Sequence, residues 1–91
     1  MAILLVANSG CVDLAGLSSN PHVLVNSDNP IARVDNGNFV VRYMGRDGDE
    51  CLFRVNARDS GGRTMERLYY VTLGEQATAT YKATDYRMQC R

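Results

Sequence analysis

The sequence predicts an all-β domain built on an antiparallel meander, and three observations indicate this fold class. Three runs rich in β-branched and aromatic residues follow one another between residues 39 and 73. Two short polar connectors that contain glycine separate the runs, as the turns of hairpins do. No stretch of the sequence has the length and periodicity of a long helix. We therefore expect about six to eight short strands, closed as a small antiparallel β-barrel or stacked as a two-sheet sandwich.

Successive side chains of a strand point to opposite sides, so each run of the meander separates into two faces. In the first two runs one face is apolar, and the other carries Arg42 in the first run and Arg54 and Arg58 in the second. We interpret the apolar faces as the core and the arginine faces as exposed. The third run has apolar residues on both faces, including Leu68 and Tyr70. It is expected either at the centre of a two-layer structure or with its outer face against a partner.

Short strands are also predicted on both sides of the meander. Residues 22–25 and 31–34 are apolar runs between polar turns, and the Asn-Gly pair at residues 36–37 predicts a tight hairpin that leads into the meander. After the meander, residues 76–84 alternate between apolar and polar side chains and are expected to form one strand. Residues 85–91 are expected as an edge strand or a frayed turn.

The N-terminal stretch places the strongest demand on its surroundings, because residues 2–7 are apolar on both faces of an extended strand. Such a strand must be covered on both sides, either within its own fold or by pairing with a neighbouring subunit. Its apolar residues and two residues of the third run are the predicted interface: Ile3, Leu4, Leu5, Val6, Leu68 and Tyr70. At most one short helical turn is expected after the stretch, near residues 13–18.

Length and composition limit the class of protein. A chain of 91 residues is expected to form one domain with a single small core. Ten basic residues balance ten acidic residues, so no overall charge attracts the chain to nucleic acid or to a membrane surface. No stretch reaches the roughly 20 apolar residues of a membrane-spanning helix, and the apolar N-terminal run lacks the length and basic flank of a signal peptide. We expect a cytoplasmic protein, or one that enters a virion after assembly in a host cell.

The chain has three cysteines, Cys11, Cys51 and Cys90, and no Cys-x-x-Cys pair that would indicate a zinc or redox site. At most one disulfide can form within the chain, with three possible pairings. The odd number favours three small, partly buried thiols in a reducing compartment.

No arrangement of residues in the sequence indicates a catalytic site, a metal site or a cofactor. His22 is the only histidine, and no nucleophile or carboxylate stands at a characteristic spacing from it. The acidic turn at residues 47–50 has oxygen ligands and a glycine, but it lacks the remaining positions of a calcium-binding loop. We therefore expect a protein without enzymatic activity, with a minor hydrolase as the less favoured alternative.

One basic cluster supports an alternative function. Four basic residues are expected on or near one sheet face: Arg42, Arg54, Arg58 and Lys82. One aromatic residue, Tyr70, is expected beside them. Small barrels bind single-stranded nucleic acid with basic and aromatic residues on such a face. The nearby acidic residues and the zero net charge favour instead a solvated face with cross-strand pairs, such as Arg54 with Glu66.

The sequence as a whole predicts a non-catalytic protein that acts through its surface, as an assembly subunit, an adaptor or an inhibitor. We expect a protein partner or self-association, and no membrane. Small β-rich chains with leftover apolar strips suit a viral or phage structural subunit (capsid, decoration or tail), or a phage-encoded inhibitor of a host protein. A small β-barrel that binds single-stranded nucleic acid is the alternative.

Overall fold

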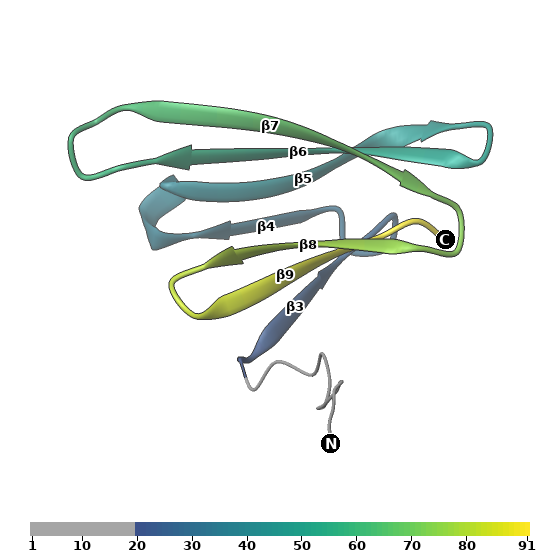
Figure 1. Ribbon diagram of the computed structural model, residues 1–91, viewed down its shortest axis with the longest axis horizontal. Coiled ribbons are helices and arrows are strands. Elements are labelled where there is room, and N and C mark those ends of the chain that lie inside the picture. Colours follow the sequence, from purple (N-terminus) through teal and green to yellow (C-terminus); the bar gives the residue numbers. More distant parts are fainter. Residues whose placement is uncertain (1–19) are drawn as a thin grey trace, which may run out of the picture.

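The computed structural model describes residues 20–91, which fold into seven β-strands in two sheets (Figure 1). The four-stranded sheet has the order β4-β5-β6-β7, with β4 at Ile31–Val34, β5 at Phe39–Asp47, β6 at Glu50–Arg58 and β7 at Thr64–Thr72. The three-stranded sheet has the order β3-β9-β8, with β3 at His22–Val25, β9 at Thr84–Gln89 and β8 at Gln76–Tyr81. The fold is a two-sheet structure without closure into a barrel, as the sequence predicted for one of its two alternatives.

The predicted meander is confirmed, because β4, β5, β6 and β7 pair antiparallel in sequence order. The apolar faces predicted for β5 and β6 form the core, where Val41 and Phe53 are completely buried. Side chains of the second sheet complete this core, and the ring of Phe39 in β5 stacks on that of Tyr81 in β8 with centroids 4.4 Å apart. The remaining buried apolar residues are Val25, Ala32, Cys51, Val55, Val71, Tyr86, Met88 and Cys90.

The connection between β4 and β5 lies where the Asn-Gly pair predicts a turn. A 3-10 turn, η1, spans Asp35–Gly37, and all three of its residues have positive φ angles, of 55°, 56° and 83°. Asparagine, aspartate and glycine tolerate this conformation better than other residues do. The short helical turn expected near residues 13–18 lies outside the described residues.

The C-terminal part differs from the prediction of one strand over residues 76–84. The strand ends at Tyr81, because Lys82 and Ala83 adopt φ angles of 48° and 62° and reverse the chain into β9. Two consecutive positive φ angles match the twist of a two-residue hairpin. The interpretation of residues 85–91 as an edge strand or frayed turn is also wrong. Strand β9 is the centre of its sheet, antiparallel to β8 and parallel to β3.

Among residues 20–91, β7 is an edge strand of its sheet, so the structure does not place the third run of the meander at the centre, the first of the two positions considered for it. Among its residues only Val71 is buried. Met65 lies near the start of β7 and is 71% exposed, although its side chain is on the same side of the sheet as that of Val71. The second sheet therefore covers the end of β7 and leaves its beginning open.

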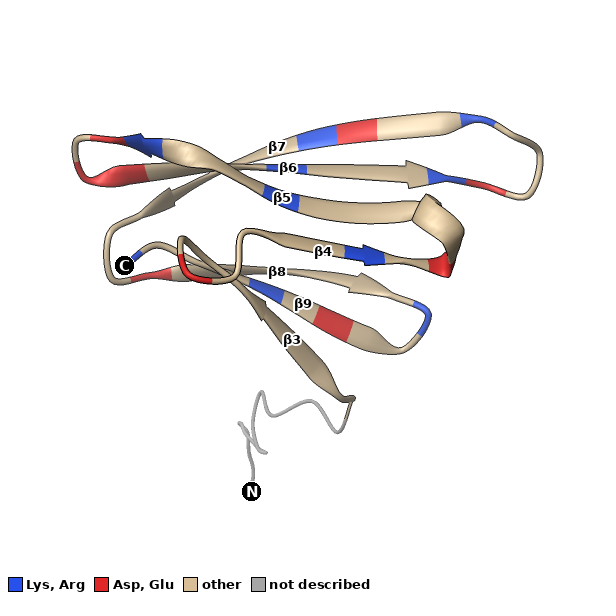
Figure 2. Cartoon of the chain, turned by 180° about the vertical axis from the view of Figure 1, so that it is seen from behind, with Lys and Arg blue, Asp and Glu red and all other residues tan. Residues whose placement is uncertain are grey.

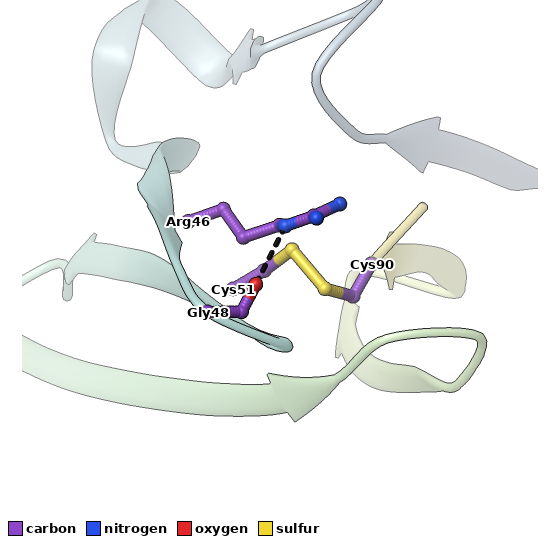
Figure 3. Close-up of a disulfide and its surroundings, with 4 residues drawn as sticks. All are labelled: Arg46, Gly48, Cys51 and Cys90. Carbon is purple, nitrogen blue, oxygen red and sulfur yellow. Dashed lines mark hydrogen bonds between the residues drawn. A yellow bond between two sulfur atoms is a disulfide. The ribbon is translucent and has the colours of Figure 1, made fainter.

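A disulfide between Cys51 in β6 and Cys90, directly after β9, links the two sheets (Figure 3). The interpretation of these two cysteines as free thiols is therefore wrong; Cys11 lies outside the described residues. Both bonded cysteines are buried, with 1% and 2% exposure. Arg46 lies beside the bond and donates a hydrogen bond from Nε to the carbonyl oxygen of Gly48 over 2.8 Å (Figure 3).

Candidate interaction surfaces

The first candidate site is the outer face of the four-stranded sheet, defined as the side chains of β4–β7 that point away from the second sheet. Leu68 and Tyr70, both predicted as interface residues, lie on this face, where they stand opposite Arg54 and Leu52 of β6. Leu68 is 46% exposed and Tyr70 is 62% exposed. Nothing within residues 20–91 packs over this face, because the second sheet covers the opposite one.

A β-bulge enlarges the apolar part of the outer face. The register of β5 against β6 shifts between Tyr43 and Gly45, which leaves Met44 as an extra residue. Met44 is 42% exposed and lines a shallow hollow of about 330 Å³ together with Leu52 and Tyr70. Gly45 adopts a φ angle of 131°, which favours glycine at this position. The bulge therefore places a flexible apolar side chain next to the aromatic ring of the predicted interface.

Three arginines of the predicted basic cluster meet on the other half of the outer face. Arg42 stands directly opposite Arg54, and Arg58 follows two positions after Asn56 on β6. All three line a second hollow, of about 220 Å³. Like charges directly opposite each other on neighbouring strands repel, so this half of the face favours an acidic counterpart.

The predicted pair of Arg54 with Glu66 forms an ion pair with 3.4 Å between Nη1 and Oε2. Its geometry is diagonal, because Glu66 stands opposite Asn56 and Arg54 stands opposite Leu68. The two side chains are 38% and 53% exposed, so the pair adds little to stability. Figure 2 shows the basic segments of β5 and β6 beside an acidic and a basic segment of β7, so charges of both signs share this sheet.

Lys82, the fourth basic residue of the predicted cluster, does not line the arginine hollow and is held by Asp35 instead. Lys82 Nζ lies 2.9 Å from Asp35 Oδ2, and the hydroxyl of Tyr81 donates to the same oxygen over 2.6 Å. These two hydrogen bonds, that of Tyr81 foremost, hold the pKa of Asp35 below its ordinary value of 3.8. The same contacts with Asp35 raise the pKa of Tyr81 and that of Lys82. The trio fastens the β8–β9 turn to η1.

The second candidate site is a cleft between β7 and β8, which the sequence did not predict. The two strands meet at the turn after Thr72 and diverge toward their other ends (Figure 1). The cleft has a volume of about 540 Å³, and Phe39, Tyr69 and Tyr81 line it with aromatic rings. Met65 stands at its rim. The alternation of the third run and the small alanines of β8 are visible in the sequence, but the divergence of the strands is not.

The remaining predicted residues give no further site. Ile3, Leu4, Leu5 and Val6 lie outside the described residues. His22 is exposed at the start of β3, and the acidic residues 47–50 lie in and beside the β5–β6 turn. Among residues 20–91, no group of histidine, cysteine, aspartate or glutamate side chains is arranged to hold a metal ion. The same part of the chain has no helix long and apolar enough to cross a membrane.

Comparisons with protein-family models, with curated protein sequences and with solved structures found no match for this chain. The two surfaces, the outer face and the cleft, are therefore interpreted from their own geometry and chemistry.

Proposed function

We propose that this protein is a non-catalytic assembly subunit, and that copies of it associate through the outer face of the four-stranded sheet. The observation that carries this proposal is the apolar half of that face, where Met44, Leu68 and Tyr70 are each more than two-fifths exposed. Apolar residues clustered on an uncovered sheet face, with a polar rim, are typical of protein–protein contacts. Tyrosine and arginine are also the residues that most often dominate binding energy at such contacts.

Charge complementarity supports association between copies. The outer face carries three arginines around one hollow, and the β5–β6 turn of the same molecule carries Asp47, Asp49 and Glu50. The basic patch and the acidic turn of a neighbouring copy are therefore complementary in charge. A contact of this kind is compatible with the zero net charge of the chain, because each copy carries both the basic patch and the acidic turn.

The native mass tests the proposal. In sedimentation or light scattering, we expect the wild-type protein to have a mass of at least twice the 10.1 kDa of one chain. Tyr70→Asp places a charge in the apolar half and is expected to weaken association at least tenfold, because an unpaired charge at a buried contact is costly. Ser60→Asp, in the β6–β7 turn, is the matched control and should leave the mass unchanged. A wild-type protein that stays monomeric at high concentration contradicts the proposal.

The disulfide supports a proposal for the location of the assembly. Disulfides persist in oxidising surroundings and are rare in cytosolic proteins, so the bond between Cys51 and Cys90 supports a particle or surface outside the reducing cytosol. We therefore propose the virion in preference to the cytoplasm as the place of function. Membership of a virus or phage particle, and inhibition of a host protein, stay predictions. Thiol titration of protein from its native source checks the point, and two reactive thiols at positions 51 and 90 would contradict it.

Binding of single-stranded nucleic acid is the second candidate, and the arginine hollow is the observation that favours it. Arg42, Arg54 and Arg58 surround this hollow, and Tyr70 lies on the same face. If the face binds nucleic acid, oligonucleotide affinity should fall steeply with salt, and Arg42→Glu should lower it at least tenfold. Arg67→Glu, on the opposite side of β7, is the control. Absence of oligonucleotide binding at low salt eliminates this candidate.

A further inference from the structure

We infer that residues 2–7 of a second copy add to β8 as an extra strand and fill the cleft between β7 and β8. The inference rests on the proposed self-association and names a second contact by which copies are joined. It makes the assembly directional, because a segment of one copy enters a different surface of the next. Such head-to-tail contacts generate rings or filaments according to the rotation between copies.

Unpaired strand edges are the first observation. Within residues 20–91, β7 pairs only with β6 and β8 pairs only with β9, so each has one edge without a neighbouring strand. An exposed edge presents backbone N–H and C=O groups that can pair with another strand. Four consecutive residues of β8, Thr78 to Tyr81, line the cleft, so the free edge of β8 borders the same space as the core-side residues of β7. A strand that pairs with β8 would therefore also lie against the inner side of β7.

The chemistry of the cleft is the second observation. Aromatic rings of Phe39, Tyr69 and Tyr81 line it, and Met65 at its rim is 71% exposed, although it lies on the core side of the sheet. Apart from the tyrosine hydroxyls, polar side chains in the lining are limited to two threonines, Glu66 and Arg67. The cleft is therefore a part of the apolar core that is uncovered along one side, and an apolar segment in extended conformation would fit it.

The sequence of residues 2–7, Ala-Ile-Leu-Leu-Val-Ala, has the chemistry and the length of this occupant. It carries no charge and no polar side chain, and its six residues equal the six of β8. A strand of this length spans about 20 Å, which is the length of the β8 edge. Alternate side chains of the added strand would enter the cleft and cover its aromatic rings.

The second face of the segment favours a second copy over the same chain. A strand beside β8 would turn its other face toward the side that carries Gln76, Thr78 and Thr80, all exposed and polar. In a single molecule that face of the segment would stay in water, because nothing within residues 20–91 covers that side. A neighbouring copy brings a further surface against it. Residues 8–19 can extend over at most about 40 Å, which is enough to reach an adjacent molecule.

Paired cysteines test the inference. In a Cys11→Ser background, one variant carries Leu4→Cys or Leu5→Cys, which probe the two faces of the segment, and the other carries Thr78→Cys on β8. Mixing the two variants under mild oxidation is expected to give a covalent heterodimer, identified by its mass. Replacing Thr78→Cys with Ser60→Cys, in the β6–β7 turn, is the matched control and should give no heterodimer. A chain that carries both cysteines and closes only within itself overturns the inference.

A second measurement separates this inference from the proposed function. Leu4→Asp is expected to lower the native mass of the full chain, because a carboxylate cannot enter the aromatic cleft without a partner. If the wild type is larger than a monomer, Tyr70→Asp reduces its mass and Leu4→Asp does not, then the outer face joins the copies and the strand contact is wrong. If the wild type is a monomer, both proposals fail.

Discussion

Asp35 is the residue on which the contact between η1 and the β8–β9 turn depends. Its carboxylate accepts hydrogen bonds from Tyr81 and Lys82, and these lower its pKa. A carboxyl group with a lowered pKa in the folded state contributes stability above its ordinary pKa, and this contribution is lost as the pH falls through the folded pKa. Stability linked to Asp35 is therefore present near neutrality, begins to fall as the pH approaches the ordinary pKa of 3.8, and is lost as the pH falls through the lower pKa of the folded state.

Asp35→Asn checks this contribution at the same backbone conformation, since asparagine also tolerates a positive φ angle. We expect the variant to be less stable than the wild type between about pH 5 and 7, with the difference shrinking as the pH falls below the ordinary pKa of aspartate. Urea denaturation at a series of pH values measures it. Asp47→Asn in the β5–β6 hairpin is the control for the loss of one negative charge. A difference that stays constant down to pH 2 would contradict this role.

At the scale of single residues, alternation correctly sorted β5 before its bulge and β6 into core-side and outer side chains, but it did not predict that the core side of β7 is exposed at its beginning. Val41 and Phe53 are buried as predicted, and Arg42 and Leu68 are on the outer face as predicted. This succeeded because the side-chain direction in a strand is a local property. The prediction that Lys82 lies near the three arginines was wrong, because the position of Lys82 depends on where the chain turns rather than on alternation.

At the scale of elements, the turn of the β8–β9 hairpin was not predicted from the sequence. Its central residues, Lys82 and Ala83, are not the glycine or asparagine that usually mark positive φ angles. The alternation of residues 76–84 therefore continued past the true end of the strand without a visible signal. The hairpin is formed because the apolar face of β9, with Tyr86 and Met88, is buried against the four-stranded sheet.

The strain in this turn gives a prediction at the element scale. Alanine with a φ angle of 62° is unfavourable, so Ala83→Gly is expected to raise stability by about 0.5–1 kcal/mol. Ala79→Gly, in the middle of β8, is the matched control and is expected to lower stability by at least a similar amount, because glycine there adds freedom to the unfolded chain and removes a methyl group that packs against the core. Thermal unfolding of both variants measures the two effects. The same sign for both would show that the turn is not strained.

For the molecule as a whole, the disulfide is the main covalent constraint on how the sheets are held. Cys51 and Cys90 are separated by 39 residues, so the bond restricts a large part of the unfolded chain. Replacing both by serine in a Cys11→Ser background is expected to lower the free energy of unfolding by about 3–4 kcal/mol. Urea denaturation against the Cys11→Ser protein measures this. A loss below about 1 kcal/mol would indicate that the cores of the two sheets suffice without the bond.

The sequence by itself determined the all-β class, the antiparallel meander, most strand positions and the arginine-bearing face, because each follows from alternation and turn chemistry within a few residues. Tertiary structure decided which strands became neighbours. It placed β9 at the centre of its sheet, paired Cys51 with Cys90 and separated β7 from β8 to open the cleft. These features depend on contacts between residues far apart in the chain, which local patterns do not encode. The main residues of the outer face could therefore be predicted from the sequence, whereas the cleft and the shape of both surfaces could not.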